Sequence, residues 1–550
     1  MKSGSLVLMT IGGQSPKKVS SLKVLFCVSE ALPFAATGGL GEVGGSLPKA
    51  LREHHPSVDV RVVMPLYKVI GSDVRDKMEF VGDIRVTFGW REEYCGLYSL
   101  SDNNIIYYFV DNEKYFKRDN LYGYDDDGER FAFFSKACLE IVSLTKFKPD
   151  VLHVNEWHTA LSIVYLRTQY KDVKDFAKTK TLFTLHNINY QGKFDPAMLN
   201  DVFGIDYRDK GILEWGGEIN LVKAAIEACD MWSTVSTPYA EEIKTSEFGM
   251  GIENVVQRNS HKLVGIMSGI DYEYYNPKTN KELFERYDKK TLAKKAMNKA
   301  GVQKLFQMQV DPTIPMLLYN GRLTQQKGVE LIMECIDDIL GDRIQMIVMG
   351  NGQKKYEDFF DHVAMKYEGK FKVVRYNGSL SKKLYAAADL VLMPSAFEPC
   401  GLCQMIASRY GAVPIVRETG GLKESVRDFG CEGGGNGYTF KNYNKEDMLY
   451  SIKRGIHDFV KDGADWEAKV RTCMETDFSW KPTVNNYIAL YKKTVKSGLE
   501  NVKVGKPVGS SANVAIPKDA KAVTNRARVT TEVDKVGVGR ASIATPIVKK

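Results

Sequence analysis

A glutamate held between two prolines is the feature of this sequence with the most direct chemical meaning. Glu398 lies between Pro394 and Pro399, which restrict the backbone of the loop. The apolar run 389–393 predicts a strand directly before this loop, and 401–410 predicts a helix after it. The first amides of such a helix attract anions. A carboxylate, a rigid turn and a helix start in this order predict a nucleotide-sugar site.

Two cations follow another expected strand. Arg322 and Lys327 come after the apolar run 316–319 and before a helical stretch, so both can point out of the carboxyl edge of a parallel sheet. Arginine offers a planar fork to phosphate oxygens, whereas lysine acts as a point charge. The pair suits a departing diphosphate, and two solvated charges at a helix start are the plainer alternative.

Two glycine turns each precede an expected helix. One is Thr37-Gly38-Gly39 and the other is Thr419-Gly420-Gly421. Without side chains, a phosphate can approach backbone N–H groups closely. Tight packing between a strand and a helix explains a single turn equally well. Two turns in the two halves of the chain could, however, clasp a sugar diphosphate from opposite sides.

Two histidines lie at the ends of expected strands. His186 follows 181–185, and His158 follows 151–154 with three residues between. Polar residues at strand ends face the ligand crevice of an open α/β sheet. We expect His186 to belong to the site and His158 to be a structural hydrogen bonder.

Metal and thiol chemistry fit the sequence poorly. Cys400 and Cys403 have the spacing of a redox or zinc motif, but no second Cys or His pair accompanies them. Asp125-Asp126-Asp127 precedes a helix, where helix capping explains it better than metal binding. We therefore expect no metal and no cofactor.

Short apolar runs alternate with amphipathic segments along the chain, which predicts an α/β fold with doubly wound, mostly parallel sheets. The pattern restarts after residue 266, so two Rossmann-like domains are expected side by side. The expected divisions are a disordered leader at 1–22, a first domain at 23–265, a second domain at 266–476, a terminal helix at 477–498 that returns towards the first domain, and a disordered basic tail at 499–550.

Composition limits the partners. Residues 501–550 carry +7 of the net charge of +8, so the body is almost neutral and no nucleic acid partner is expected. The tail is either a solvated extension or a weak ligand of an acidic surface. No apolar run reaches the roughly 18 residues of a membrane span. Nine cysteines, without paired spacing apart from Cys400 and Cys403, indicate reduced thiols in a cytoplasm. The oligomeric state stays open.

These residues together resemble the bacterial glycogen synthases and plant starch synthases, which are retaining glucosyltransferases of the GT-B fold. The resemblance runs from about Lys23 to Ser497, and its six motifs fall in the family's order. They are Cys-Val-Ser-Glu30, Thr37-Gly-Gly-Leu, His186-Asn, Gly321-Arg-Leu-Thr with Lys327-Gly, Pro394-Ser with Phe397-Glu-Pro-Cys-Gly-Leu, and Thr419-Gly-Gly-Leu.

The resemblance implies two Rossmann-like domains facing across a deep cleft, with the acceptor on the first and the nucleotide sugar on the second. It implies transfer of glucose from ADP-glucose to the non-reducing end of an α-1,4-glucan such as glycogen. The anomeric configuration would be retained, and no metal ion would be needed. Arg322 and Lys327 would neutralise the leaving ADP. Glu398 would lie near the donor glucose, His186 by the glucosyl carbon, and Tyr376 on the adenine. The other implied donor-pocket positions are Thr37, Gly38, Gly39, Glu42, Glu156, Ser268, Cys400, Gly401, Leu402, Thr419, Gly420 and Gly421.

Four positions that border the implied donor pocket depart from the family's pattern. Ala36 stands where the family has Lys, Glu42 and Glu156 where it has Asp, and Ser268 where it has Asn. Loss of one charge-assisted phosphate contact at Ala36 costs about 1.5 to 3 kcal/mol, or one to two powers of ten in donor use. A weakened or altered enzyme is therefore expected more readily than an inactive one.

Two alternatives remain beside this prediction. One is the same fold acting on a different nucleotide sugar, and the other is a weakly active or inactive glucan- or nucleotide-binding paralogue. A glucan phosphorylase would need a pyridoxal-phosphate lysine site and usually a longer chain, and the sequence shows neither feature.

Overall fold

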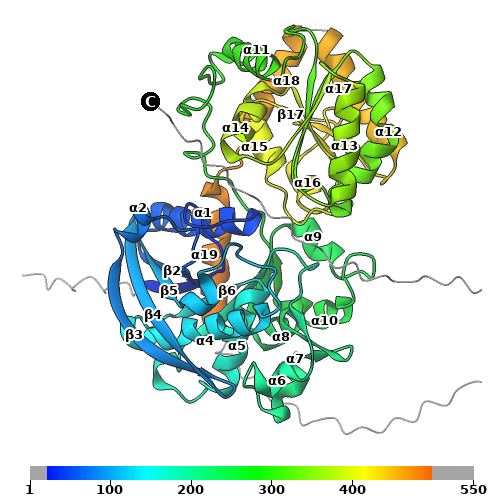
Figure 1. Ribbon diagram of the computed structural model, residues 1–550. Helices are drawn as coiled ribbons and strands as arrows, with labels where there is room; N and C mark the ends of the chain where they lie inside the picture. The colour runs from blue at the N-terminus through cyan, green and yellow to red at the C-terminus, as the bar shows by residue number, and fades with distance from the viewer. Residues whose placement is uncertain (1–20, 462, 498–550) are drawn as a thin grey trace, which may run out of the picture.

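The structure is a computed structural model and describes residues 21–461 and 463–497 (Figure 1). Two helix-covered sheets lie one above the other in this view, with the earlier part of the chain below. The leader predicted at 1–22 falls outside the described residues except for its last two positions, and Leu22 already begins the first strand. The tail predicted at 499–550 also lies outside them.

The first sheet has nine strands in the order β12-β11-β7-β6-β1-β2-β5-β4-β3. All neighbours are parallel except β3 with β4 and β4 with β5. The apolar β1 is buried, as expected for a strand with helices on both faces. The strands are β1 (Leu22–Cys27), β2 (Val58–Pro65), β3 (Glu79–Phe88), β4 (Arg91–Asp102), β5 (Ile105–Asp111), β6 (Val151–Asn155), β7 (Lys180–Leu185), β11 (Met231–Thr234) and β12 (Leu263–Gly265).

Helices and a small three-stranded sheet complete this part of the chain. The helices are α1 (Gly39–His54), α2 (Ser72–Arg75), α3 (Glu113–Phe116), α4 (Asp127–Thr145), α5 (Trp157–Thr168), α6 (Met198–Asp201), α7 (Lys210–Leu213), α8 (Leu221–Ala228), α9 (Thr237–Glu242) and α10 (Glu253–Arg258). The small sheet has β8 (Lys193–Phe194), β9 (Glu214–Trp215) and β10 (Glu218–Asn220).

The second sheet has six parallel strands in the order β15-β14-β13-β16-β17-β18. The predicted α/β class with two doubly wound sheets is confirmed. The strands are β13 (Met316–Asn320), β14 (Gln345–Met349), β15 (Phe371–Val374), β16 (Leu390–Met393), β17 (Val413–Arg417) and β18 (Tyr438–Phe440). The helices are α11 (Lys295–Leu305), α12 (Val329–Gly341), α13 (Lys354–Lys366), α14 (Gly378–Ala387), α15 (Cys403–Arg409), α16 (Gly420–Ser425), α17 (Lys445–Lys461) and α18 (Gly463–Glu475).

The last described helix, α19 (Trp480–Lys496), crosses back to the first sheet and lies beside α1 in Figure 1. Its buried residues Tyr487 and Leu490 join the core of the first domain. The Tyr491 hydroxyl makes a 2.8 Å hydrogen bond with Nδ1 of the buried His153 on β6. This helix therefore ties the end of the second domain to the first.

Strand order places the predicted site residues at neighbouring loops. β7, β6 and β1 are adjacent in the first sheet, and β13, β16 and β17 are adjacent in the second. Parallel strands end at the same edge of a sheet, where ligands bind in open α/β folds. The loops after these six strands hold His186, Glu156, Thr37, Arg322, Glu398 and Thr419.

A buried ion pair fixes the start of β16, the strand that leads to Glu398. Nζ of Lys299 lies 2.6 Å from Oδ2 of Asp389, which also accepts a hydrogen bond from the Met316 amide at 2.8 Å. We expect Lys299→Met to lower the free energy of unfolding by about 3 to 5 kcal/mol, because the buried carboxylate loses its partner. Chemical denaturation measures this loss.

The matched control is Lys289→Met, which breaks the half-exposed pair with Glu475. An exposed pair contributes less than about 1 kcal/mol. Equal losses of stability in the two variants would contradict the role given to the buried pair.

Candidate active site

Lys327 and Glu398 form an ion pair, with Nζ 2.5 Å from Oε2. The carboxylate also accepts a hydrogen bond from Oγ of Ser395 at 3.0 Å, and Glu398 is only 5% exposed. A buried carboxylate needs such a partner because an unpaired buried charge is costly. The loops that carry the two residues are joined further by a hydrogen bond from the Ala396 amide to the Gln326 carbonyl.

Arg322 stands apart from this pair and is exposed. Its Nη1 donates a 2.9 Å hydrogen bond to the hydroxyl of Tyr190, which belongs to the first domain. Within 21–461 and 463–497 no carboxylate pairs with this guanidinium. The structure thus leaves one predicted cation available to an outside anion.

The turn at 419–421 packs directly on the loop of Glu398. A Cβ on Gly420 would lie 2.0 Å from the Glu398 carbonyl oxygen, and one on Gly421 would lie 2.0 Å from that of Cys400. The Gly421 amide donates to the Glu398 carbonyl, and the Gly420 amide donates to Oε1 of Glu242 at 2.8 Å. Close backbone packing therefore accounts for both glycines, and protein oxygens already occupy both amides.

The amides of Gly401 and Leu402 at the start of α15 differ in this respect. Among the described residues neither amide has a protein acceptor. A phosphate oxygen could therefore bind here without displacing a protein group.

The turn at 37–39 is open on its outer side. A Cβ on Gly38 would contact none of the described residues within 4 Å, and one on Gly39 would lie 3.7 Å from Cδ1 of Leu402 in the second domain. Glu30 holds the turn from beneath, because it accepts hydrogen bonds from the amide and from Oγ1 of Thr37. The two predicted turns thus face the same loop from opposite domains.

Glu156 fixes the backbone at the end of β7. Its Oε1 accepts hydrogen bonds from the amides of His186 and Asn187 at 2.6 and 2.9 Å. Burial raises the pKa of Glu156 to about 8, although the amide hydrogen bonds lower it. The residue has a φ of 63°, a strained value for a side chain of this size, and such strain is concentrated at functional sites.

His186 is a neutral imidazole in this setting. Burial lowers its pKa to about 4, and Nε2 lies 3.1 Å from Oδ1 of Asn155. The buried His158 stacks on Trp157 with ring centroids 4.0 Å apart, and burial lowers its pKa to about 3. His158 thus lies among aromatic rings beneath the site.

The remaining predicted positions surround this centre. Tyr376, on the loop after β15, is 60% exposed and offers a free ring face. The buried Ser268 lies beside Cys400, whose thiol pKa burial raises to about 12. Glu42 accepts a hydrogen bond from the hydroxyl of Tyr275 across the two domains. No cluster of metal-ligating side chains occurs in the described chain.

A cavity of about 690 Å³ opens beside Tyr190 on the first domain. Its wall combines aromatic rings with polar groups, a composition suited to sugar rings. The lining residues are Asp127, Trp157, Asn189, Tyr190, Gln191, Gly192, Lys193, Phe194 and Met250.

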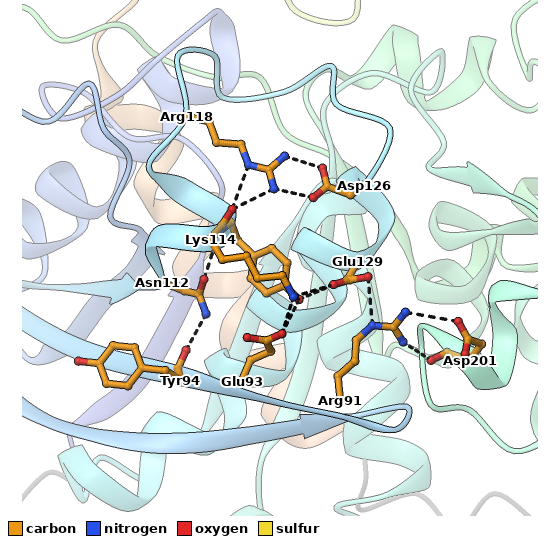
Figure 2. Close-up of polar contacts among 10 residues, drawn as sticks. Arg91, Glu93, Tyr94, Asn112, Lys114, Arg118, Asp126, Glu129 and Asp201 are labelled. Atoms are coloured by element: carbon orange, nitrogen blue, oxygen red, sulfur yellow. Dashed lines mark hydrogen bonds and ion pairs between the residues drawn. The ribbon is translucent and has the colours of Figure 1, made fainter.

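Figure 2 shows a polar network around the start of α4, whose first residue, Asp127, lines this cavity. Arg118 binds both carboxylate oxygens of Asp126 at 2.7 and 2.6 Å, while Glu129 pairs with Arg91 at 3.1 Å. Capping was the predicted role of the Asp triplet. That prediction is wrong for Asp126, which occupies the N-cap of α4 but makes no capping hydrogen bond, because the arginine engages its carboxylate.

Sequence reasoning missed several partners at this site. Glu30, Glu242 and Tyr275 were not predicted as contributors, nor was Tyr190. A local signal existed only for Glu30, a polar residue three positions after the end of β1. The others act through contacts between the two domains, which no local pattern encodes.

Comparison with known proteins places the chain in a family. The family model described as "Starch synthase catalytic domain" matches residues 23–258, and "Glycosyl transferases group 1" matches 303–471. The glycogen synthase of Clostridium novyi (strain NT) is 44% identical over 475 residues, covering 86% of this chain and 98% of that protein. The chain belongs to the glycogen synthase family. The glycogen synthase of Desulforamulus reducens is 41% identical over 481 residues, covering 87% and 100%.

Solved structures agree with this assignment. The catalytic domain of Starch Synthase IV from Arabidopsis thaliana, bound to ADP and acarbose, superimposes with a TM-score of 0.81 at 31% identity, covering 87% of this chain and 100% of that chain. Sucrose-phosphate synthase from Thermosynechococcus elongatus, at 16% identity, 86% and 98% coverage and a TM-score of 0.57, shares the fold. The predicted resemblance to glycogen and starch synthases and the predicted GT-B fold are confirmed.

The positions that depart from the family's pattern hold distinct places in the site. Ala36 is exposed next to the open turn, whereas Glu156 and Ser268 are buried. Glu42 and Glu156 both retain a carboxyl group that accepts hydrogen bonds. Of the four positions, Ala36 is therefore the one at which the family's charged side chain is replaced by an uncharged one.

The raised pKa of Glu156 makes the free energy of unfolding of this protein depend on pH. Between its ordinary pKa of 4.5 and about 8, the folded state keeps a proton that the unfolded state has lost. Raising the pH through this window therefore lowers the free energy of unfolding, and the slope ends above pH 8. We expect Glu156→Gln, which cannot ionise, to show a flatter decline between pH 5 and pH 8 in urea denaturation.

Other buried acids contribute to the slope as well, so the difference between the two proteins is the quantity to compare. The exposed Glu368→Gln serves as the control and should follow the wild type. A wild-type slope retained in full by Glu156→Gln would show that this carboxyl does not carry the raised pKa.

Proposed function

We propose that this protein transfers glucose from ADP-glucose to the non-reducing end of an α-1,4-glucan such as glycogen, with retention of configuration. The observation that carries the proposal is that Lys327 pairs with the buried Glu398, whereas no carboxylate in the described part of the chain pairs with Arg322. Membership in the glycogen synthase family supports it. The bound ADP and acarbose of the Arabidopsis relative support the choice of nucleotide and of a sugar acceptor.

Charge stabilisation is the main catalytic contribution in this proposal. As the bond between glucose and diphosphate breaks, its electrons pass to the departing ADP, and Arg322 and Lys327 stabilise that charge. A new bond forms between the glucosyl carbon and the oxygen of the acceptor hydroxyl, and the proton of that hydroxyl passes to a phosphate oxygen of the departing ADP. No covalent nucleophile is required. The amides of Gly401 and Leu402 add donors for the diphosphate, because neither amide donates to a protein oxygen of the described residues.

Three side chains position the donor in this proposal, two at the glucose and one at the adenine. Glu398 accepts hydrogen bonds from sugar hydroxyls while Lys327 neutralises it. His186, with a pKa of about 4, is neutral above about pH 5 and acts by hydrogen bonding near the glucosyl carbon. Tyr376 offers its exposed ring to the adenine.

The remaining positions shape the donor pocket. Thr37, Gly38 and Gly39 form its open wall on the first domain. Glu156 holds the backbone amides at the end of β7, and Glu42 bonds the side chain of Tyr275 from the second domain. Ser268, Cys400 and the turn Thr419-Gly420-Gly421 pack beneath the loop of Glu398. The glucan occupies the cavity beside Trp157 and Phe194.

We place the protein in the cytoplasm. All nine cysteines are free thiols, as expected in a reducing compartment. No helix among the described residues is long and apolar enough to cross a membrane. The near-neutral body favours neither nucleic acid nor another polyanion as a partner.

Incubation with labelled ADP-glucose and glycogen tests the proposal. Arg322→Ala should lower kcat/KM about 100-fold or more, because one donor to the developing charge is lost. Glu398→Ala should also be strongly impaired, since it removes a sugar contact and leaves Lys327 unpaired. Arg343→Ala, an exposed arginine paired with Asp311 away from the site, is the control.

Equal incorporation by the wild type and both site variants would refute the site assignment. Faster transfer from UDP-glucose than from ADP-glucose would instead favour the alternative donor. Binding of ADP-glucose by calorimetry without elongation of glycogen would favour a binding paralogue, for which Ala36 and Ser268 are the arguments.

Position 36 offers a second test of the donor site. Ala36→Lys should raise kcat/KM for ADP-glucose about tenfold or more, because a cation at the open turn gains a charge-assisted contact with phosphate. Ala36→Gln has a similar reach without charge and should change little. A gain of the same size in both variants would mean that contact area, rather than charge, limits donor use.

A further inference from the structure

Tyr190 touches both halves of the candidate site. Its hydroxyl accepts the 2.9 Å hydrogen bond from Nη1 of Arg322, and the guanidinium carbon lies 5.8 Å from the ring centroid. The same side chain lines the 690 Å³ cavity together with Trp157 and Phe194. It is 44% exposed, so one ring face remains available.

The first domain holds Tyr190 on a rigid loop. The Tyr190 amide bonds to the Asn187 carbonyl at 3.1 Å, and the Ile188 amide bonds to the hydroxyl of Tyr239 at 3.0 Å. Nε2 of Gln191 donates to the carbonyls of Ile188 and Met250. At the other end of this loop, Glu156 fixes the amide of His186. Tyr190 therefore has a set position relative to the catalytic histidine.

Arg322, in contrast, belongs to the second domain and has a long side chain with many rotamers. Its backbone follows β13, and its guanidinium is exposed. Among the described residues the Tyr190 hydroxyl is the hydrogen-bond partner of this guanidinium. The bond therefore limits the directions in which the guanidinium can point, which is the kind of ordering that binding otherwise has to supply.

We propose that Tyr190 is a positioning residue that couples the acceptor cavity to the leaving-group cation. A glucan packs on the Tyr190 ring without breaking the hydrogen bond between the Tyr190 hydroxyl and Arg322. That hydrogen bond then directs the guanidinium towards the diphosphate. The ring thus contributes to glucan binding, and the hydroxyl contributes to the rate of transfer. This inference rests on the proposed function, since it assigns Arg322 to the diphosphate and the cavity to the glucan.

The two parts of the side chain can be removed separately. Tyr190→Phe keeps the ring and deletes the hydroxyl, so kcat should fall about tenfold while KM for glycogen stays unchanged. Tyr190→Ala removes both parts, so KM for glycogen should rise in addition. Tyr207→Phe, at an exposed tyrosine elsewhere on the first domain, is the control and should match the wild type.

A double-mutant cycle with Arg322→Ala separates positioning from a general structural effect. If the hydroxyl acts through the guanidinium, Tyr190→Phe should cost less than about twofold in kcat once Arg322 is absent. Affinity for ADP, measured by calorimetry, should show the same pattern. A tenfold loss in both backgrounds, or a Tyr190→Phe variant with unchanged kcat and unchanged ADP affinity, would overturn the proposal.

Failure of the proposed function gives a different result. A wild type that transfers glucose from UDP-glucose only would refute the donor assignment, and the cycle would then be run with that donor. A wild type that binds ADP without transfer would refute the enzymatic proposal, and ADP affinity would still decide whether Tyr190 acts through Arg322.

Discussion

The buried carboxylate of Glu398 is the constraint on which the rest of the site depends. At 5% exposure it requires a positive partner, and Lys327 supplies one at 2.5 Å. This pairing joins the loop after β13 to the loop after β16. The two cations are held differently, because Lys327 is paired with a protein carboxylate, whereas within the described residues no carboxylate pairs with Arg322.

Contacts between the domains build the remainder of the site. Glu242 from α9 bonds the amide of Gly420, Tyr275 bonds Glu42 on α1, and Tyr190 bonds Arg322. Each of these bonds joins one residue of the first domain to one of the second. The candidate active site is therefore a property of the pair of domains, and relative movement between them would alter it directly.

Sequence patterns predicted the fold, and the neighbouring positions of the candidate site residues, for identifiable reasons. Apolar runs such as 390–393 and 413–416 define buried parallel strands, and polar residues directly after them must lie at the sheet edge. That reasoning brought Arg322, Lys327 and Glu398 to one edge. The same patterns could not show that Glu242 accepts the hydrogen bond of the Gly420 amide. Nor could they show that the Asp126 carboxylate binds Arg118 instead of capping α4. Those outcomes depend on which side chains meet in the folded chain, and local periodicity does not record that.

The most direct test of this account is a crystal structure of the protein with bound ADP. The account predicts phosphate oxygens within about 3 Å of the guanidinium of Arg322 and the ammonium of Lys327, with Glu398 still beside the latter. A nucleotide bound elsewhere, or a diphosphate held only by the turn at 419–421 with both cations turned away, would contradict it.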